Sequence, residues 1–275
     1  MKNNLSAKYF SKKAKFYDEV DEQLYWVLSD KLLWHNFEKT LKSLPKNFTF
    51  IDAGGGTGRW TQKILKKFPL SSGVLFDISE SMLEIARVKL SNYEKGGRLA
   101  ITKGDFENPK NLGSMKFNIA FNFHNVIGFT SDPKKFIDNL ANVTKKGGFV
   151  VTFAPNVYHG VYFNIGIGNI REAKKIATQK RGRFTKEMPI INFFTPESIK
   201  NLYKLAGLSI IAITGFPNCI YPNFQETQVR GQTTSLKKLL SSNSVFKNVF
   251  SIEKLLSKNN DISSRGNNIY ILGRK

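Results

Sequence analysis

A glycine-rich stretch flanked by acidic residues is the part of this sequence best suited to bind a small molecule. Gly54, Gly56 and Gly58 follow an apolar run. That run ends at Asp52, and a second apolar run ends at Asp77. Glycines between a strand and a helix let the backbone approach a ligand closely and leave helix N–H groups facing it. If the two runs are neighbouring parallel strands, both carboxylates lie at one sheet edge, where they suit a ligand with an ammonium group and a ribose diol.

Two common nucleotide-binding patterns do not fit this glycine stretch. A dinucleotide fingerprint needs glycine at the sixth position counted from Gly54, and that position is Arg59. A phosphate-binding P-loop needs Gly-Lys-Ser or Gly-Lys-Thr after the glycines, and this tripeptide is absent there. The sequence therefore disfavours both a nicotinamide cofactor and a nucleoside triphosphate.

The elements around the glycines alternate between strand-like and helix-like patterns. Alternation of this kind predicts an α/β fold with a parallel sheet and helices on both faces. The predicted strands are residues 48–52, 73–77, 99–102, 117–121, 149–153, 208–214 and 268–273. The predicted helices are one or two within 5–44, then 59–68, 79–90, 133–144, a helix from Thr195-Pro196 to Ala206, and one from about Thr234 to Leu256.

The organisation along the chain predicts a single domain, residues 1–275, in four segments. We expect an N-terminal helical lid over 1–46 and a ligand-binding core over 47–155. Residues 156–194 are rich in glycine, aromatic and basic residues with no clear strand, and we interpret them as an insertion. Residues 195–275 supply a helix and the last strands, with an excursion from Phe216 to Arg230.

The bulk composition is that of a soluble globular protein with an unusual charge. No stretch of 18 or more apolar residues is present, the start lacks an apolar signal region, and Cys219 is the single cysteine. These features predict a cytoplasmic protein with no cysteine metal cluster. The net charge is +21, but only nine of the 42 basic residues are arginine. A lysine-rich composition explains this better than a nucleic-acid role, although Arg171 to Lys186 concentrates basic residues.

The sequence Asp52-Ala53-Gly54-Gly55-Gly56-Thr57-Gly58 resembles the first motif of class I S-adenosylmethionine-dependent methyltransferases. The resemblance covers about residues 48–155 and continues through 75–82, 104–106, 117–120 and 145–149. It implies a Rossmann-like, doubly wound, seven-stranded sheet, mostly parallel, with one antiparallel strand near the C-terminus. Phe10 to Asp18 is similar to the opening segment of the quinone-biosynthesis-like small-molecule subgroup.

The resemblance also implies which residues bind S-adenosyl-L-methionine. Asp77 would hold the ribose hydroxyls and Asp105 the adenine amino group, with Ile78 and Phe106 on the adenine faces. Asp52 would lie below the loop and orient it. The other residues expected at the cofactor are Gly54, Gly56, Gly58, Met82, Asn122 and the lid residue Tyr17. Asp77 and Asp105 could instead be ordinary caps at strand-to-helix turns, and Met82 has the helical spacing of a core residue.

The acceptor is expected beyond the fourth strand, next to His124 and Asn125. His124 is a candidate general base because the unperturbed pKa of histidine is near neutrality; the alternative is a purely hydrogen-bonding role. The polar aromatic residues available in the insertion and the excursion are Tyr158, His159, Tyr162 and Tyr221. Basic neighbours favour an acceptor with a carboxylate or phosphate, unless they form a solvated face.

The predicted function is methyl transfer to a compact small-molecule acceptor, without a metal. The Asn-Pro-Pro-Tyr motif of many amino methyltransferases that act on DNA bases or protein glutamine is absent. Two alternatives stay open at this point: an RNA methyltransferase, especially one acting on tRNA, and a noncatalytic cofactor-binding subunit. The sequence predicts neither the oligomeric state nor the methylated atom.

Overall fold

A seven-stranded sheet forms the centre of the computed structural model, which describes residues 2–221, 235–256, 258 and 260–275. The strand order is β3-β2-β1-β4-β5-β9-β8. Strands β1 to β5 are parallel, whereas β9 runs antiparallel to both β5 and β8. The strands are β1 (Thr49–Ala53), β2 (Ser72–Asp77), β3 (Leu99–Lys103), β4 (Phe117–Asn122), β5 (Thr144–Pro155), β8 (Ser209–Phe216) and β9 (Asn268–Arg274). The predicted mostly parallel, doubly wound sheet with one antiparallel strand near the C-terminus is confirmed.

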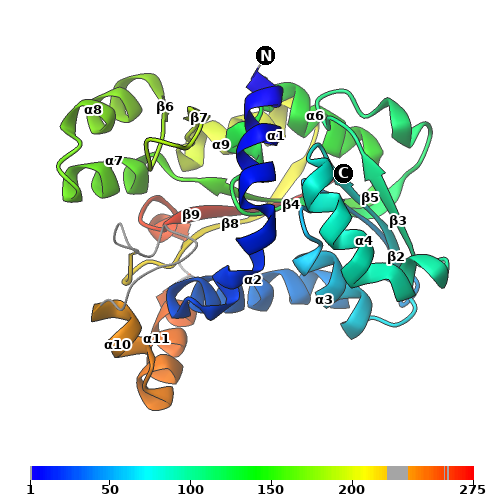
Figure 1. Ribbon diagram of the computed structural model, residues 1–275, viewed down its shortest axis with the longest axis horizontal. Helices are drawn as coiled ribbons and strands as arrows, with labels where there is room; N and C mark the ends of the chain where they lie inside the picture. The colour runs from blue at the N-terminus through cyan, green and yellow to red at the C-terminus, as the bar shows by residue number, and fades with distance from the viewer. Residues whose placement is uncertain (1, 222–234, 257, 259) are drawn as a thin grey trace.

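One face of the sheet is covered by five helices: α2 (Leu24–Lys42), α3 (Arg59–Lys67), α4 (Glu80–Lys95), α10 (Ser235–Leu240) and α11 (Asn243–Leu256). Their apolar side chains join those of the strands in one buried cluster that includes Leu28, Ile64 and Phe121. Figure 1 shows α2, α3, α10 and α11 below the sheet edge. Apolar residues at helical spacing thus place α2 against the sheet, as its sequence predicts.

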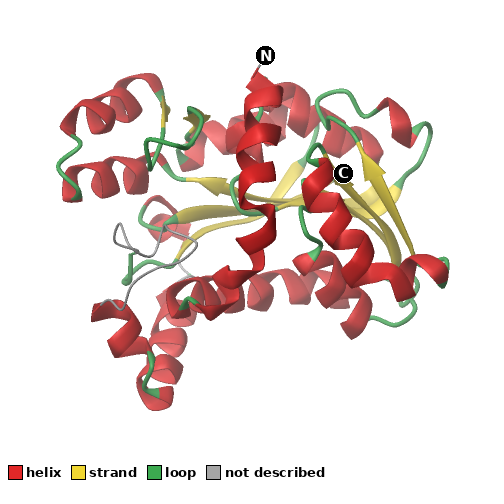
Figure 2. Cartoon of the chain, in the orientation of Figure 1, coloured by secondary structure: helices red, strands yellow, loops and turns green. Residues whose placement is uncertain are grey.

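The other face is covered by α5 (Val126–Phe129), α6 (Pro133–Val143) and α9 (Pro196–Leu205). Two of these helices begin at the caps that their sequences specify. The Asp132 side chain accepts the backbone N–H of Lys135 at 3.0 Å, and Thr195 forms a capping box with Ser198. The sheet is therefore a central layer between two helical layers (Figure 2).

The N-terminal segment crosses the carboxyl edge of the strands. It consists of α1 (Lys2–Lys13) and the 3-10 helix η1 (Ala14–Glu22), before α2 begins. In Figure 1, α1 stands upright across the middle of the molecule. Short 3-10 turns also occur at η2 (Lys110–Leu112) and η4 (Asn260–Ser264). The expected one or two helices within residues 5–44 are therefore two α-helices joined by a 3-10 segment.

Residues 156–194 are more regular than their sequence indicates. They form α7 (Val157–Gly166), α8 (Ile170–Gln179) and a two-stranded ribbon, β6 (Arg181–Gly182) with β7 (Ile191–Asn192). The sequence does not predict α7 because it contains two glycines and no charged residue, so its amphipathic pattern is weak. A small apolar cluster of Phe129, Ile176 and Phe193 anchors the insertion to the core.

The C-terminal excursion differs from its prediction in one respect. The single helix expected from about Thr234 to Leu256 is two helices, α10 and α11, separated at Ser241-Ser242. Thr234 and the part of the excursion from 222 to 230 lie outside the described residues. None of the described helices is both long and apolar enough to cross a membrane.

Candidate active site

The glycine loop between β1 and α3 forms the floor of a cavity at the carboxyl edge of the strands. Gly54 has a φ of +83° and donates its N–H to the carbonyl oxygen of Phe76 at 2.7 Å. A Cβ atom at Gly54 would lie 2.6 Å from the side chain of Val126. Glycine at this position is thus required both by the left-handed backbone and by the close approach of α5.

Asp77 ends β2 at the side of this loop, as the spacing predicts. Its Oδ2 accepts the N–H of Gly56 at 2.8 Å, and its Oδ1 accepts the N–H of Ser79 at 2.8 Å. Burial raises the pKa of the carboxyl group, and the two N–H donors act against that rise. Each carboxylate oxygen has a second lone pair, so Asp77 can still accept hydrogen bonds from a ligand in the cavity.

Asp52 lies beneath the loop and is buried. Its Oδ2 accepts the hydroxyl of Thr61 at 2.8 Å, and a Cβ at Gly55 would lie 3.0 Å from the same oxygen. Burial raises the pKa of Asp52 to about 7. Asp52 therefore supports the loop from below, in the position expected for a residue that orients it.

The far wall of the cavity comes from the segment after β3. The Oδ1 of Asp105 accepts the N–H of Glu107 at 2.9 Å, which holds the carboxylate at the cavity. Phe106 is buried, and its ring packs against those of Phe76 at 5.5 Å and Phe136 at 5.3 Å. Phe106 is thus a core residue that also lines the cavity.

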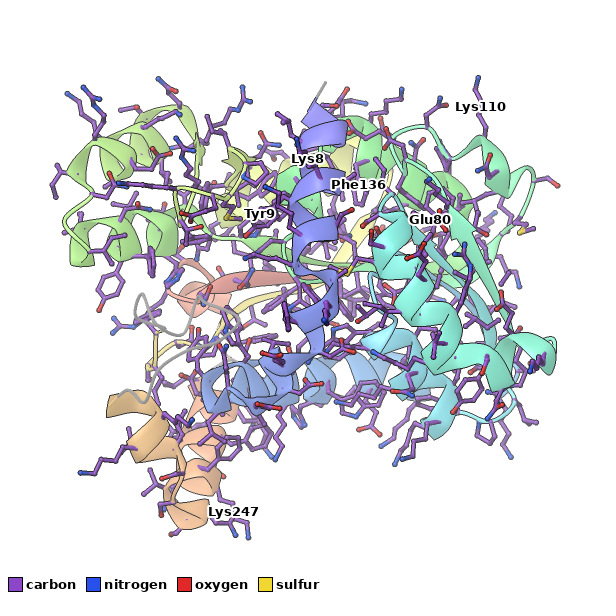
Figure 3. The ribbon with its side chains drawn as sticks, in the orientation of Figure 1. Lys8, Tyr9, Glu80, Lys110, Phe136 and Lys247 are labelled. Atoms are coloured by element: carbon purple, nitrogen blue, oxygen red, sulfur yellow. The ribbon has the colours of Figure 1, made fainter. Side chains whose placement is uncertain are left out.

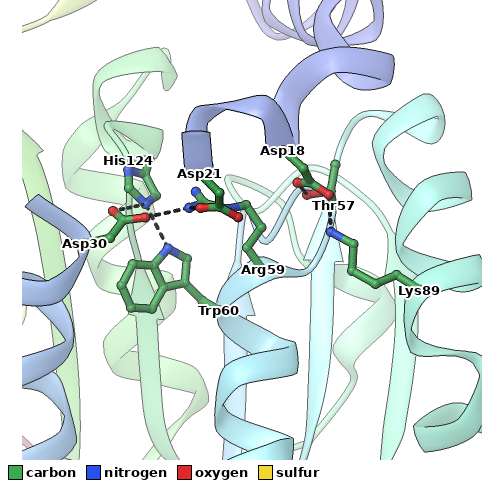
Figure 4. A network of polar contacts seen from close by, with 8 residues as sticks. All are labelled: Asp18, Asp21, Asp30, Thr57, Arg59, Trp60, Lys89 and His124. Atoms are coloured by element: carbon green, nitrogen blue, oxygen red, sulfur yellow. Dashed lines mark hydrogen bonds and ion pairs between the residues drawn. The ribbon is translucent and has the colours of Figure 1, made fainter. Parts of the chain in front are cut away.

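Ion pairs fasten the lid segment η1 over the cavity (Figure 4). The Oδ1 of Asp18 accepts the hydroxyl of Thr57 at 2.6 Å, and its Oδ2 pairs with Lys89. Asp21 pairs with the guanidinium group of Arg59. These contacts join residues that are 38 to 71 positions apart in the chain, so the lid is tied to both α3 and α4.

His124 lies at the end of β4 in a buried polar group. The indole N–H of Trp60 donates to its Nε2 at 2.8 Å, and Asp30 Oδ1 is 3.3 Å from the same nitrogen. Asp30 also binds Arg59 at 2.6 Å. Burial lowers the pKa of His124, an effect that Asp30 opposes. Because Nε2 accepts the indole hydrogen, the neutral ring carries its own proton on Nδ1.

The backbone at His124 and the following residue is unusual. His124 has a φ of +52° and Asn125 a φ of +70°, although neither residue is glycine. Two successive non-glycine residues in the left-handed region cost on the order of 1–3 kcal/mol each, and such conformations cluster at functional sites. This turn places His124 in the lining of two adjoining cavities and Asn125 in the lining of one of them.

Comparison with known proteins identifies the core of the chain. Residues 50–148 match the family model described as a methyltransferase domain. Residues 50–148 are thus a methyltransferase domain. This confirms the family expected from the motif at Asp52 to Gly58, and the cofactor class of that family is S-adenosyl-L-methionine.

The methyltransferase domain is similar to two curated enzymes with different names. Malonyl-[acyl-carrier protein] O-methyltransferase 1 of Ilyobacter polytropus is 30% identical over 151 residues, covering 54% of this chain and 52% of the relative. The ubiquinone/menaquinone biosynthesis C-methyltransferase UbiE of Saccharophagus degradans is 32% identical over 120 residues, covering 42% and 46%. The chain thus spans about half the length of each. A solved S-adenosylmethionine-dependent methyltransferase from Thermotoga maritima shares the fold, with a TM-score of 0.57, 18% identity and 98% of both chains covered.

Most residues predicted to bind the cofactor of the methyltransferase domain gather at the first cavity. Those that line it are Tyr17, Asp52, Gly54, Gly56, Asp77, Ile78, Met82, Asp105 and Phe106. Two others lie elsewhere. A Cβ at Gly58 would lie 2.5 Å from Leu90, so this glycine allows α4 to pack closely. Asn122 is buried and donates to Thr152 at 2.8 Å, away from the cavity lining.

A second cavity adjoins the first and shares five of its lining residues: Phe10, Tyr17, Arg59, His124 and Phe129. Of the residues predicted to bind the acceptor, Asn125 and His159 line it. Tyr158 and Tyr162 are exposed instead, and Tyr221 donates its hydroxyl to the carbonyl oxygen of Arg265 at 2.6 Å. Only the ring of Tyr221, 5.5 Å from that of His159, connects it to the cavity wall.

Four residues of this region were not predicted from the sequence to belong to the site: Lys13, Asp30, Arg59 and Trp60. Lys13 lines the second cavity with its amino group 4.5 Å from the ring centre of Tyr9. Figure 3 labels Tyr9 on α1. Asp30 is a buried carboxylate on the mostly apolar side of α2, and Trp60 is the second residue of α3. An acidic residue on a mostly apolar helix face is a sequence signal that could have indicated this polar group.

Proposed function

We propose that this chain transfers a methyl group from S-adenosyl-L-methionine to a small-molecule acceptor that carries an anionic group. The observation that carries the proposal is the pair of adjoining cavities at the carboxyl edge of the sheet, with His124 at their boundary. The cofactor supplies an electrophilic methyl group, and the protein aligns it with the acceptor. Relatives named for O-methyl and for C-methyl transfer support the reaction class and leave the methylated atom open.

The polar groups that line the first cavity suit S-adenosyl-L-methionine. We assign Asp77 to the ribose hydroxyls, because both of its oxygens are held by backbone N–H groups and keep free lone pairs. Asp105 is assigned to the adenine amino group, with Ile78 and Phe106 against the ring. Gly54 and Gly56 would allow the methionine part to approach the backbone, with Met82 and Tyr17 closing the sides.

The second cavity favours an anionic, partly aromatic acceptor. Among the described residues that line it, none is aspartate or glutamate, while Lys13 and Arg59 are cationic. Arg59 is already paired with Asp21 and Asp30. Lys13 forms no such close ion pair among the described residues, although the charge of Glu187 acts on it, so Lys13 is the cation we assign to a ligand. Six aromatic rings line the cavity as well: Tyr9, Phe10, Tyr17, Trp26, Phe129 and Phe184. These rings and the Lys13 ammonium suit a carboxylate or phosphate attached to a planar or apolar body.

His124 is assigned to the acceptor as a hydrogen-bond donor. The neutral ring has its proton on Nδ1 while Trp60 donates to Nε2, so no lone pair remains to accept a proton from the acceptor. This assignment replaces the general-base role that its unperturbed pKa suggested. It favours acceptors whose attacking atom is unprotonated before the reaction, because such an atom needs no base.

Neither alternative drawn from the sequence has a specific observation in its favour. An RNA methyltransferase would rest on the net charge and on the basic stretch from Arg171 to Lys186. A noncatalytic subunit would leave the second cavity without a role. The division into a lid (1–46), a core (47–155), an insertion (156–194) and a C-terminal part (195–275) is kept as part of the proposal. A cytoplasmic location and a preference for small acceptors over nucleic acid stay predictions of the sequence.

The test is a titration followed by an acceptor screen. Calorimetry with S-adenosylhomocysteine should show micromolar binding, and NADH should not bind. Labelled methyl transfer should then be screened over small carboxylates and phosphates, with bulk tRNA as a separate substrate. Lys13→Gln should raise KM for an anionic acceptor about tenfold and leave cofactor affinity unchanged. Methylation of tRNA without any small acceptor, or failure to bind S-adenosylhomocysteine, would reject the proposal.

A further inference from the structure

The outward face of α7 is apolar, although it is exposed. Tyr158, Tyr162 and Ile165 are 52%, 60% and 54% exposed. Their spacing of four and three residues places them on one side of the helix. The opposite side carries Val157, Gly160 and Phe163, which are buried. The buried side also holds His159 and Asn164. Neither side carries a charged residue and most side chains on both are apolar, a pattern expected of a helix that is covered on both sides.

Composition does not explain this face. The net charge is +21, and lysines lie on elements far apart in the molecule, among them the Lys8, Lys110 and Lys247 labelled in Figure 3. Residues 147–170 nevertheless contain no Asp, Glu, Lys or Arg. The first part of this stretch is the buried strand β5, where charges are not expected, but α7 is exposed. An unbiased surface helix of this chain would carry lysines, so their absence from α7 needs a physical reason.

The apolar side chains continue to the tip of the hairpin and meet cationic ones there. Ile167, in the turn before α8, is 38% exposed, and Ile170, the first residue of α8, is 60% exposed. Arg171 and Lys174 follow and are also exposed. Ile170 and Lys174 are four residues apart, on one side of α8. Figure 1 shows α7 and α8 side by side at one end of the long axis, away from the sheet.

We propose that this α7–α8 hairpin docks on an anionic lipid surface. Tyrosine rings prefer the boundary between apolar and aqueous phases, isoleucines insert below it, and Arg171 and Lys174 would pair with acidic headgroups. Charge complementarity selects this occupant over a second copy of the chain, because two molecules of net charge +21 repel each other. The inference goes beyond methyl transfer and does not require it.

The surface also adjoins the second cavity. His159 lines that cavity from α7, and its ring is 6.4 Å from that of the exposed Tyr162. Phe184, which follows β6, lines the same cavity and packs 5.8 Å from His159. Docking through α7 would therefore hold the acceptor cavity next to the lipid headgroups.

Sedimentation with vesicles tests the proposal. The full chain is mixed with phosphatidylcholine vesicles, with and without phosphatidylglycerol, and the bound fraction is measured. The wild type should bind the anionic vesicles, and the triple variant Tyr162→Ser/Ile165→Ser/Ile170→Ser should bind about tenfold more weakly. The matched control Leu70→Ser/Val88→Ser/Leu205→Ser removes three other exposed apolar side chains, 63%, 81% and 67% exposed, and should bind like the wild type.

Three outcomes would overturn the proposal. Equal binding of the triple variant and the wild type would assign the binding to net charge alone. Absence of wild-type binding to anionic vesicles would exclude the lipid surface. A wild-type dimer that the triple variant loses, seen by light scattering, would assign the face to a second copy. Circular dichroism and S-adenosylhomocysteine titration check that each variant folds, and loss of that titration in the wild type would reject the proposed function while leaving the vesicle result intact.

Discussion

The two adjoining cavities are encoded in different ways. The first takes most of its lining from one continuous region between Asp52 and Phe136, where strand ends follow each other along the chain. The second draws on the N-terminal segment from Tyr9 to Trp26, the insertion at His159 to Met188, and Asn267 with Asn268. Local spacing therefore specifies the first cavity, whereas only the tertiary fold assembles the second. Substitutions in the first should change cofactor affinity, and those in the second should change acceptor kinetics.

The largest effect is expected at Gly54. In Gly54→Ala a Cβ would meet Val126 at 2.6 Å on a backbone with φ of +83°, so affinity for S-adenosylhomocysteine should fall about a hundredfold. Gly97→Ala is the matched control, because Gly97 has a φ of +69° and a Cβ there would meet no described atom within 4 Å. Calorimetry measures both. If Gly54→Ala bound S-adenosylhomocysteine with wild-type affinity, the glycine loop would not be part of the cofactor site.

The next effect is expected at Asp77. Asp77→Ala should weaken S-adenosylhomocysteine binding by roughly 1.5–3 kcal/mol, the scale of hydrogen bonds to a charged group. Asp132→Ala is the control, since Asp132 accepts one backbone N–H as a helix cap and lies outside both cavity linings. It should lower the melting temperature only. If Asp77→Ala, like Asp132→Ala, lowers the melting temperature but leaves S-adenosylhomocysteine affinity unchanged, Asp77 is only a cap.

His124 should affect turnover more than cofactor binding. His124→Ala should lower kcat about tenfold, because a donor to the acceptor is lost. Nitrogen NMR should find the proton of His124 on Nδ1, and Trp60→Phe should shift it toward Nε2, where Asp30 can accept it. The chain has three histidines, so the signals are assignable. Trp34→Phe is the control. An Nε2 proton in the wild type would restore His124 as a candidate base.

Asp52 should make the cofactor region less stable as pH rises. Its folded pKa of about 7 lies above the ordinary value of 3.8, so the folded state binds the proton more tightly. Stability is therefore lost as pH rises between these two values. Relative to the wild type, the melting temperature of Asp52→Asn, which keeps an acceptor for Thr61, should rise as pH increases from 4 to 8. A difference between variant and wild type that does not change with pH would contradict the raised pKa of Asp52.

His159 should have the opposite effect in the insertion. Burial lowers its pKa from 6.5 to about 3, so the unfolded state binds the proton more tightly. Stability is complete above pH 6.5 and declines as pH falls toward 3. Relative to the wild type, the melting temperature of His159→Phe should rise as pH falls from 6.5 toward 3, the opposite trend to that of Asp52→Asn. A difference from the wild type that does not change with pH would show that His159 is accessible to protons when folded.

The sequence predicts the strands well because buried parallel strands read as short apolar runs, such as Phe117 to Phe121. Thr195-Pro196 predicts the start of α9 because capping is a local interaction. Gly58 could not be separated from Gly54 and Gly56, since its role depends on Leu90, which lies far along the chain. Local spacing thus gives the sheet and the loop but not every role within the loop.

The polar group around His124 illustrates the opposite case. Trp60 and His124 are 64 positions apart, and Arg59 meets Asp30 across 29 positions. No periodicity connects such pairs, because their contact depends on how α2 and α3 pack on the sheet. The helices α7 and α8 were missed for a related reason. α7 contains glycines and no charged residue, so its sequence alone does not predict a helix. Its packing depends on tertiary contacts, such as that between Phe193 and Gly160.

The place of β9 has a consequence for how the chain is made. This strand holds residues 268–274, yet it lies between β5 and β8 rather than at an edge. On a ribosome, β1 to β5 can pair as they emerge, whereas β8 must wait without a neighbour until β9 has been synthesised. The sheet is then completed by inserting a strand between two others, a step with high contact order and hence slow folding. A nascent chain stalled before residue 268 would expose the edges of both β5 and β8 to chaperones and to aggregation.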